Sequence, residues 1–374
     1  MELKELRNQI DIIDQEILQK FQQRMELCLK VAEYKKEHNV EILQSGREKE
    51  VINGIRCKAE PRYADSAAVL FSNIMDISKS YQQCEINKDK EFTEYETLYT
   101  TNLSKLGCYG GVGSNSDEAA KRIFGPDRKM IYYREFEDVF KAVDSGELDF
   151  GVVPIQNSST GSISQTYDLM KKYKVYITQM TRVSIKHCLA ANTDDIDEIK
   201  SVYSHHQALM QCSGYLEKKG FKPVRYASTA AAARYAARSS KKIAAICSEK
   251  CALLYGLNII EKNISDIESN YTRFICISKK CRIDDSANRI SVLMSLSNEE
   301  GSLYKILTKF RVAGLNLLKI ESRPLNRGDF DVTFYLDFEG NIINKKVSSL
   351  LIELGNELAD FRFLGNYREY ARIN

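Results

Sequence analysis

The sequence predicts a multidomain protein in which an all-helical part, an α/β part and an α+β part follow one another. Of its 19 glycines and five prolines, only Gly46, Gly54 and Pro61 precede residue 107, so turn-forming residues are scarce there and long helices are expected. From Leu106 short apolar runs alternate with helical segments, and after Ser286 strict apolar alternation takes over. The 374 residues leave room for about two to four domains.

Composition and charge exclude several classes of protein. The net charge of +3 is too small for a nucleic-acid binder that relies on many phosphate contacts. The ten cysteines include no CxxC pair and only four histidines occur, so neither a disulfide framework nor a zinc site is supported. The first residues lack the features of a secretory signal, and no 18 apolar residues run together. We therefore expect a cytoplasmic protein with buried free thiols, without metal or organic cofactor, and without a membrane or nucleic-acid partner.

The first part should contain three helices. Its apolar residues recur every three or four positions from Leu3 to Ile17, which predicts a helix that continues to about Lys36. A second helix should begin near Arg47, and a third should span roughly Arg62 to Gln83. We expect a helical domain over residues 1–86 and a linker over residues 87–105, which has no Gly or Pro and is partly helical.

The other two parts differ in how their strands and helices alternate. Residues 106–281 have short apolar runs between helical segments, such as Phe150–Val153 and Ile243–Ile246, and an alanine-rich helix over Thr229–Arg238. Residues 288–374 predict, in order, a strand, a helix, two strands, a helix and a strand. Their expected spans are 290–296, 302–313, 315–323, 330–338, 347–358 and 361–364. The βαββαβ order in so few residues is typical of a ferredoxin-like module.

Cations on the first helix predict an anion site. Arg24 and Lys35 are 11 residues apart, which separates them by about 20° in azimuth and about 16 Å along a helix, so both can reach one small anion. Arg24 also falls on the apolar stripe, where an unpaired guanidinium is costly. Arg7 lies about 25 Å from Arg24 and is turned by about 100°, so it can join this site only from a second subunit. The alternative is that all three are solvated helix charges.

The complete pattern over residues 1–86 resembles the all-helical chorismate mutase family. It comprises Leu6-Arg7, Ile10, Ile13-Asp14, Arg24, Val31, Lys35, Arg47-Glu48, Ile74, Ser78 and Gln82. The resemblance implies that Arg7 of a partner chain, Arg24 and Arg47 hold the substrate carboxylates, and that Lys35 and Gln82 donate to the breaking ether oxygen. Glu48 would accept from the ring hydroxyl, with Ser78 assisting. Gln44 stands where many members have an aspartate, so hydroxyl recognition is expected to be weaker.

Residues 106–281 resemble prephenate dehydratase in the order and spacing of several polar motifs. These contain Ser114 and Ser116, Asn157, His187, Gln211, Thr229, and Thr272-Arg273-Phe274. The resemblance implies two α/β lobes, periplasmic-binding-protein-like, with the site between them. It makes Thr272 the proton donor for loss of the ring hydroxyl and the other residues substrate-binding, with Arg273 directed at a substrate carboxylate or at its own loop.

Three departures from the dehydratase pattern leave alternatives open. Gln156 replaces the usual glutamate, His206 the usual proline, and Gly111 a proline. Two rivals therefore remain beside an active prephenate dehydratase: a non-catalytic ligand sensor, and a dehydratase that prefers arogenate, the aminated analogue.

The last module resembles the regulatory ACT domain. Gly301-Ser302-Leu303 and Glu321-Ser322 resemble the two phenylalanine-binding motifs of that domain, with Ser302 for the usual alanine. The three resemblances together point to the bifunctional chorismate mutase/prephenate dehydratases of phenylalanine biosynthesis. They imply conversion of chorismate to prephenate and then to phenylpyruvate, feedback inhibition by phenylalanine, and a homodimer or higher homo-oligomer.

Overall fold

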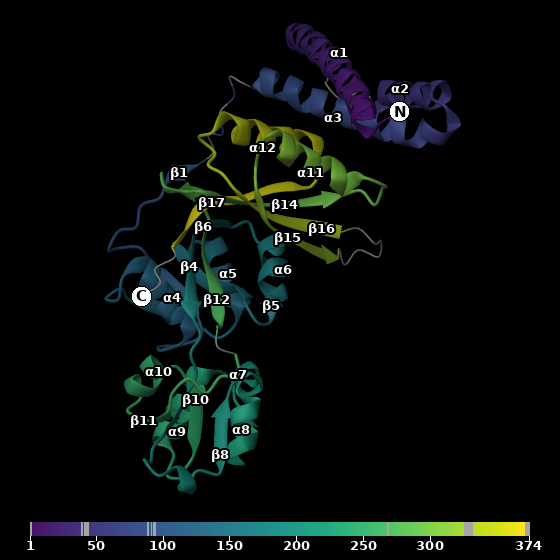
Figure 1. Ribbon diagram of the computed structural model, residues 1–374. Coiled ribbons are helices and arrows are strands. Elements are labelled where there is room, and N and C mark those ends of the chain that lie inside the picture. The colour runs from purple at the N-terminus through teal and green to yellow at the C-terminus, as the bar shows by residue number, and fades with distance from the viewer. Residues whose placement is uncertain are drawn as a thin grey trace. The chain divides into compact units, whose positions relative to one another are not determined.

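The computed structural model describes residues 2–38, 40, 45–87, 90, 92, 95–267, 269–324 and 332–370. Gln44 and Phe330 lie outside these ranges. The chain forms two compact units, one of residues 1–93 and 290–363, the other of residues 94–289 and 364–374 (Figure 1). The first unit joins the N-terminal helices to most of the C-terminal module, and the second holds the α/β part.

The first unit opens with the three predicted helices. They are α1 (Leu3–Glu37), α2 (Ser45–Lys58) and α3 (Ala64–Asn87), the last preceded by a 3₁₀ turn over Pro61–Tyr63. At 1.5 Å per residue the 35 residues of α1 span about 52 Å. Helix α3 packs against both α1 and α2.

The C-terminal elements follow the predicted βαββαβ order. They are β14 (Arg289–Leu296), α11 (Ser302–Val312), β15 (Leu317–Pro324), β16 (Val332–Glu339), α12 (Lys345–Glu357) and β17 (Phe361–Tyr370). Their strands lie in the order β15-β16-β14-β17, as in a ferredoxin-like module. Helices α11 and α12 lie on one face of this sheet, and α3 packs against both helices (Figure 1).

Strand β17 is longer than the sequence predicts. Its first three residues belong to the first unit, and residues 364–370 belong to the second. There Arg368 and Tyr370 pair in parallel with Gln179 and Thr181 of β6. The second half of β17 is a strand because it pairs with β6, which is far away in the sequence. The local sequence pattern does not reveal this pairing.

One lobe of the second unit is built on the strand order β17-β6-β12-β4-β2-β3. Strands β2, β3 and β4 are parallel, whereas β12 runs antiparallel between β4 and β6. The elements are β2 (Leu106–Tyr109), α4 (Asn115–Phe124), β3 (Met130–Tyr133), α5 (Phe136–Ser145), β4 (Phe150–Asn157), β5 (Gly161–Ser162), α6 (Ser164–Lys172), β6 (Tyr176–Ser184) and β12 (Tyr271–Ser278).

The other lobe is a five-stranded sheet in the order β11-β7-β10-β8-β9. Its elements are β7 (Cys188–Ala191), β8 (Ser201–Ser204), α7 (His206–Gln211), α8 (Ser213–Lys219), β9 (Lys222–Arg225), α9 (Thr229–Arg238), β10 (Ala244–Cys247), α10 (Glu249–Leu254) and β11 (Asn258–Glu261). Helix α9 confirms the predicted alanine-rich helix, whose small side chains pack closely over the sheet. The chain therefore crosses between the lobes after β6 and again before β12.

The segment predicted as a linker is more ordered than expected. Helix α3 runs to Asn87, and Glu96–Thr97 form a short strand, β1, that pairs with β13 (Arg282–Ile283). All ten cysteines are free, and seven of them are buried. Within the described ranges, no helix is long and apolar enough to cross a membrane, and no cluster of three metal-ligating side chains occurs.

Candidate active sites

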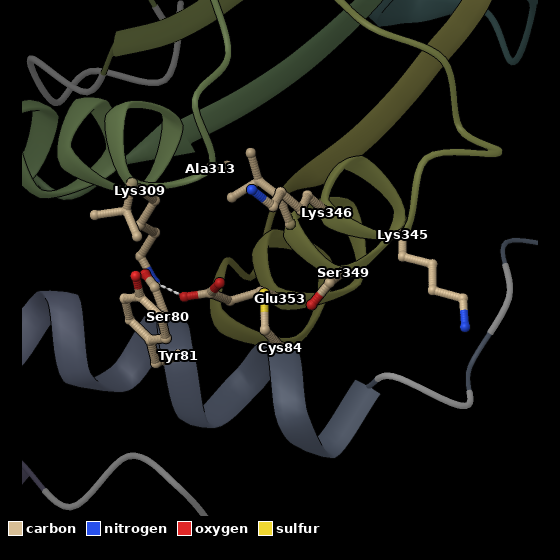
Figure 2. A pocket seen from close by; sticks show the side chains of 11 residues that line it. Ser80, Tyr81, Cys84, Lys309, Ala313, Lys345, Lys346, Ser349 and Glu353 are labelled. Atoms are coloured by element: carbon tan, nitrogen blue, oxygen red, sulfur yellow. Dashed lines mark hydrogen bonds and ion pairs between the residues drawn. The ribbon is translucent and has the colours of Figure 1, made fainter. Parts of the chain in front are cut away.

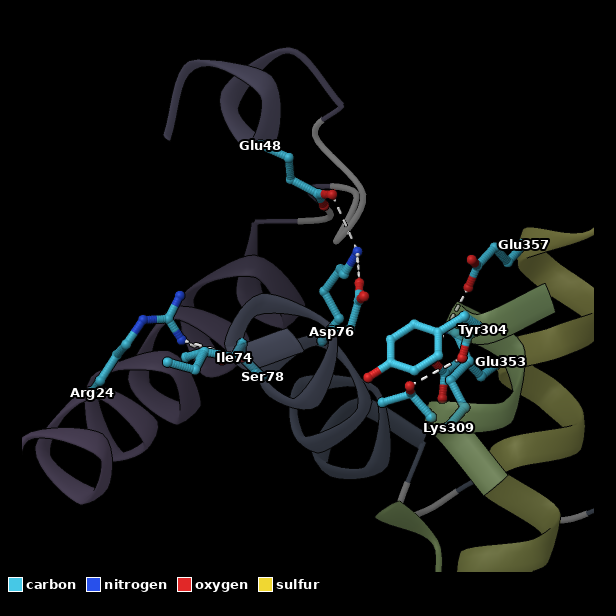
Figure 3. A network of polar contacts seen from close by, with 11 residues as sticks. Arg24, Glu48, Ile74, Asp76, Ser78, Tyr304, Lys309, Glu353 and Glu357 are labelled. Carbon is cyan, nitrogen blue, oxygen red and sulfur yellow. Dashed lines mark hydrogen bonds and ion pairs between the residues drawn. The ribbon is translucent and has the colours of Figure 1, made fainter. Parts of the chain in front are cut away.

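The first site begins with a contact between α1 and α3. The Arg24 guanidinium donates to the Ser78 hydroxyl and, at 3.5 Å, to the carbonyl oxygen of Ile74 (Figure 3). Gln82 follows Ser78 by one helical turn and is also buried. Two predicted site residues therefore meet where α1 crosses α3, and a third lies one turn further along α3.

Lys35 and Glu48 extend this site toward α2. Burial lowers the pKa of Lys35, while the nearby charge of Glu48 opposes this shift, so the ammonium of Lys35 lies within electrostatic range of the Glu48 carboxylate. The Glu48 carboxylate itself accepts a hydrogen bond from Lys79 at 3.1 Å. Lys79 also pairs with Asp76 at 2.8 Å.

The sequence analysis did not include Lys79. The signal that was available is Asp76, three residues earlier and on the same face of the helix. Lys79 holds Glu48 against α3, and it thereby fixes the carboxylate within electrostatic range of Lys35 of α1.

Two predicted arginines do not reach this cluster within one chain. The Arg47 guanidinium pairs with Glu50 at 3.1 Å, and both side chains are 70% exposed. Arg7 is exposed near the start of α1, 17 residues before Arg24. The cluster of Arg24, Lys35, Glu48, Ser78 and Gln82 is therefore only part of the predicted set.

The second site is a cavity of about 420 Å³ in the second unit. Predicted residues on its wall are Ser114, Ser116, Asn157, His187, Gln211, Thr229, Thr272 and Phe274. They come from both lobes, so the cavity lies between the lobes, as the resemblance implied. Its wall also includes Tyr109, Phe136, Ile163, Gln165 and Ile185, which no local motif marked out.

Two helices begin at the wall of this cavity. The Ser114 hydroxyl caps α4 by accepting from the N–H of Asp117 at 3.2 Å, and the Ser228 hydroxyl caps α9 by accepting from the N–H of Ala231 at 3.1 Å. Gly110 turns the chain into α4 with φ of 97°, a conformation that favours glycine. The positive ends of both helix dipoles favour an anionic ligand in the cavity.

Backbone groups fix the orientation of the Asn157 amide. Its oxygen accepts from the N–H of Ser159 at 3.0 Å and of Thr160 at 3.2 Å, and its nitrogen faces the carbonyl of Tyr271 at 3.2 Å. Backbone N–H and C=O groups cannot exchange roles, so the amide has one orientation. The Asn157 nitrogen therefore donates to the Thr272 hydroxyl oxygen, at 2.9 Å.

A chain of hydrogen bonds leads from His187 to Asn157. Nε2 of His187 lies 3.1 Å from the Gln211 side-chain oxygen, the Gln211 nitrogen donates to Ser159 Oγ at 2.9 Å, and Ser159 Oγ donates to the Asn157 oxygen at 2.6 Å. Burial lowers the pKa of His187, against the opposing effect of its bond with Gln211. The imidazole is therefore neutral at pH 7, with its proton on Nε2.

In this series of hydrogen bonds each residue donates to the next, and the last acceptor is Thr272. Because Asn157 donates to Thr272 Oγ1, the hydroxyl proton of Thr272 has to point elsewhere, and the residue lines the cavity. Aligned hydrogen bonds polarise one another, so each donor in the series strengthens the next. The arrangement presents Thr272 to the cavity as a proton donor. Ser159, which links the two lobes in this chain, was not predicted.

Arg273 does not line the cavity, which corrects its predicted role as a substrate-binding residue. Successive side chains of a strand point to opposite faces, so Arg273 is directed away from the cavity that Thr272 and Phe274 line. Its guanidinium pairs with Glu369 of β17 at 3.0 Å and donates to the Gln156 side-chain oxygen at 3.0 Å. Glu369 also pairs with Arg182 at 2.8 Å and Arg289 at 2.9 Å.

The unusual residues of the dehydratase motifs lie away from the cavity wall. Gln156 belongs to the arginine cluster around Glu369, and neither His206 nor Gly111 lines the cavity. Replacement of the usual glutamate by Gln156 therefore removes no carboxylate from the wall.

The predicted phenylalanine motifs lie in the C-terminal module. Gly301 precedes α11 with φ of 80°, and the Ser302 and Ser297 hydroxyls are 3.2 Å apart. Leu303 is half-buried in the first turn of α11. Glu321 and Ser322 lie in β15, opposite Tyr335 and Phe334 of β16.

Comparison with known proteins identifies the family. Residues 106–282 match the prephenate dehydratase family, and residues 6–83 match chorismate mutase type II. The bifunctional chorismate mutase/prephenate dehydratase of Aquifex aeolicus (strain VF5) is 31% identical, over 98% of each chain. The chain belongs to the bifunctional chorismate mutase/prephenate dehydratase family. It is therefore an isomerase and a lyase of phenylalanine biosynthesis, which converts chorismate to prephenate and prephenate to phenylpyruvate.

Two other similar proteins cover a smaller share of the chain. The arogenate dehydratase/prephenate dehydratase 2 of Arabidopsis thaliana is 36% identical over 78% of this chain and 81% of its own. The solved prephenate dehydratase of Arthrobacter aurescens, in complex with L-Phe, is 28% identical with a TM-score of 0.65, over 70% of this chain and 89% of its own. The likeness to this bifunctional family therefore includes the fold of the dehydratase part.

Proposed function

We propose that Thr272 is the proton donor of the dehydratase reaction. The C–C bond to the ring carboxylate breaks, CO₂ leaves, and its electron pair enters the ring. The ring C–O bond breaks at the other end, and the departing hydroxyl takes the Thr272 proton and leaves as water. Solvent then restores the proton to Thr272. The observation that carries this proposal is the bond from the Asn157 amide to Thr272 Oγ1, which leaves the Thr272 proton free for the leaving group.

The remaining residues of the cavity wall serve binding in this proposal. The dianionic substrate is attracted by the N-terminal ends of α4 and α9, where Ser114, Ser116 and Thr229 lie. Phe274 contributes an apolar wall. His187 and Gln211 hold the hydrogen-bond chain in one direction.

Thr272→Val and Thr272→Ser test this role. Valine has the shape of threonine without the hydroxyl, so Thr272→Val should lower kcat for prephenate by about 10² or more while KM changes little. Thr272→Ser keeps the hydroxyl and should retain part of the activity. Equal activity of Thr272→Val and wild type would remove Thr272 from the mechanism.

We infer that the mutase site is completed across a homodimer. One chain brings Arg24, Lys35, Glu48, Ser78 and Gln82 together, but leaves Arg7 exposed about 25 Å from Arg24. The apolar stripe of α1 is also exposed, with Ile10 and Ile17 each 55% accessible. A second α1 that covers this stripe would bury it and bring Arg7 to the other site. Lys35 and Gln82 then donate to the ether oxygen, and Arg7, Arg24 and Arg47 hold the carboxylates.

Mixing two inactive variants tests the shared site. Arg7→Ala and Lys35→Ala chains should each lose most of their mutase activity, but mixed dimers should recover part of it because one of their two sites is intact. Subunit exchange is verified with differently tagged chains. Exchange without recovered activity would contradict the shared site.

We propose that the C-terminal module is an ACT domain that binds phenylalanine. The βαββαβ topology and the two motifs, at Gly301–Leu303 and Glu321–Ser322, support this proposal. The Arthrobacter aurescens relative in complex with L-Phe supports it as well. Phenylalanine should inhibit the dehydratase of wild type, and Ser322→Leu should abolish this inhibition without loss of uninhibited activity.

The domain boundaries and substrate preference are also part of the proposal. We propose a mutase domain over residues 1–86 and a dehydratase domain over 106–281, in line with the matched ranges, together with a linker over 87–105 and an ACT domain over 288–374. We propose prephenate rather than arogenate as the dehydratase substrate, because the Aquifex aeolicus relative, which matches over 98% of each chain, is named for prephenate. We also propose a cytoplasmic location.

A further inference from the structure

A second cavity lies in the first unit, and its wall includes none of the residues assigned to the mutase site or to the cavity around Thr272. It measures about 260 Å³ and lies between α3, the end of α11 and the beginning of α12 (Figure 2). Its wall consists of Ser80, Tyr81, Cys84, Lys309, Val312, Ala313, Lys345, Lys346, Ser349, Leu350 and Glu353. The predicted phenylalanine motif lies at the opposite end of α11, so this cavity is not that site.

Two buried hydroxyl groups on this wall have no hydrogen-bond partner. Ser80 is 6% exposed and Ser349 is 4% exposed, and the Oγ atom of each is unpaired. An unpaired buried hydroxyl costs free energy, which a ligand that bonds to it recovers. These two hydroxyls from α3 and α12 are therefore ready to bind a polar group.

The charged side chains of the wall favour one sign of charge on the ligand. Three lysines, Lys309, Lys345 and Lys346, stand against one carboxylate, that of Glu353. Lys309 is already paired with Glu353 and also with Glu357, which is not part of the wall, so the positive charge left for a ligand is that of Lys345 and Lys346 (Figure 3). Lys345 and Lys346 also lie in the first turn of α12, whose dipole adds to their positive charge. The excess charge favours an anion.

The rest of the wall is apolar and the cavity is small. Val312, Ala313, Leu350 and the Tyr81 ring suit a hydrocarbon body. A volume of about 260 Å³ lies just below the range of about 300 to 1,000 Å³ that is typical of pockets for drug-sized ligands. The ligand is therefore of metabolite size. An α-ammonium group would face the lysines and find no free carboxylate.

We propose that this cavity binds a small aryl-alkyl carboxylate that has no amino group. The carboxylate lies near Lys346 and the beginning of α12, and the apolar body lies against Leu350 and Tyr81. Ser80 is only two residues from Ser78 of the mutase site, so the ligand contacts the same helix from another face. The site is independent of Thr272 and of the phenylalanine motifs.

Cys84 provides a direct test, because it lies on the cavity wall and is exposed. Cys57 of α2 is another exposed free cysteine, and it does not line the cavity, so it serves as an internal control. The full chain is alkylated with iodoacetamide in the presence of 3-phenylpropanoate, and the labelled peptides are followed by mass spectrometry. At ten times the Kd, the labelling rate of Cys84 should fall about tenfold, since only unoccupied chains react. The rate at Cys57 should not change.

Two further arms define the ligand class. 3-Phenyl-1-propanol lacks the charge and L-phenylalanine carries the amino group, so each should protect Cys84 much less than 3-phenylpropanoate does. Lys346→Glu should lose the protection, whereas Lys58→Glu, which changes an exposed lysine of α2, should keep it. Unchanged labelling of Cys84 in wild type at 10 mM 3-phenylpropanoate, or equal slowing at Cys57, would overturn the site. Protection by L-phenylalanine as strong as by 3-phenylpropanoate would overturn the ligand class.

Discussion

Glu369→Gln should weaken the dehydratase unit through the arginine cluster. Glu369 is the carboxylate that pairs with Arg182, Arg273 and Arg289, at distances of 2.8 to 3.0 Å. Its side chain is 9% exposed, whereas those of the three arginines are between 13% and 42% exposed. Glutamine keeps the shape but leaves three guanidinium groups facing one another without a counter-charge.

The magnitude follows from these exposures. Removal of one partner from a buried pair costs about 3 to 5 kcal/mol, and an exposed pair contributes at most about 1 kcal/mol. A buried carboxylate with partly exposed partners lies between these limits, at about 2 to 3 kcal/mol. At about 2 to 4 °C per kcal/mol for a unit of this size, Tm of the dehydratase transition should fall by about 5 to 10 °C.

Calorimetry and two activity assays check this prediction. Dehydratase kcat should fall as well, because Arg273 fixes the strand that carries Thr272, while mutase activity should be unchanged. Glu96→Gln is the matched control, since Glu96 also pairs with two cations, Lys280 and Arg282, but is exposed. It should leave Tm nearly unchanged. If Glu369→Gln shifts Tm no more than Glu96→Gln does, the cluster is not a structural anchor.

Three other predictions concern the two units. Lys35→Ala should lower mutase turnover by about 10² and leave dehydration of supplied prephenate unchanged; parallel loss of both activities in a folded variant would contradict separate sites. Truncation after Phe363 removes the segment of β17 that pairs with β6, so it should abolish dehydratase activity and spare the mutase; a fully active dehydratase would refute this role of β17. Burial lowers the pKa of His187 in the folded chain below the ordinary histidine value of 6.5. As the pH falls, the unfolded chain therefore takes up a proton at this residue before the folded chain does, and the stability of the folded state decreases. Between pH 7.5 and 5.5, Tm of wild type should therefore fall more than Tm of His187→Asn, and equal slopes would contradict a buried neutral imidazole.

The sequence predicted the elements whose apolar residues recur with a clear period. The stripe from Leu3 to Ile17 marked α1, and the alternation from Ile290 to Leu296 marked β14, because one face of each element is apolar. Polar motifs also predicted most of the dehydratase cavity, since several of them lie at the end of a strand or the beginning of a helix between the lobes.

Long-range pairing could not be predicted in this way. Glu369 reaches Arg273 across 96 positions, and nothing in the local sequence of β17 indicates β6 as its partner. Ser159 joins the hydrogen-bond chain because a turn after β4 brings it to Gln211 of the other lobe. The orientation of Arg273 was predictable, however, because Thr272 and Phe274 were both assigned to the cavity and the residue between them in a strand has to face the other side.

Time courses with chorismate test the central claim, that one chain carries two working sites. The purified full chain is given chorismate, and prephenate and phenylpyruvate are both followed until chorismate is consumed. Prephenate should rise and then fall, and phenylpyruvate should finally equal the chorismate supplied. Accumulation of prephenate to the full amount, without phenylpyruvate, would contradict the account and show that the cavity around Thr272 binds its ligand without chemistry.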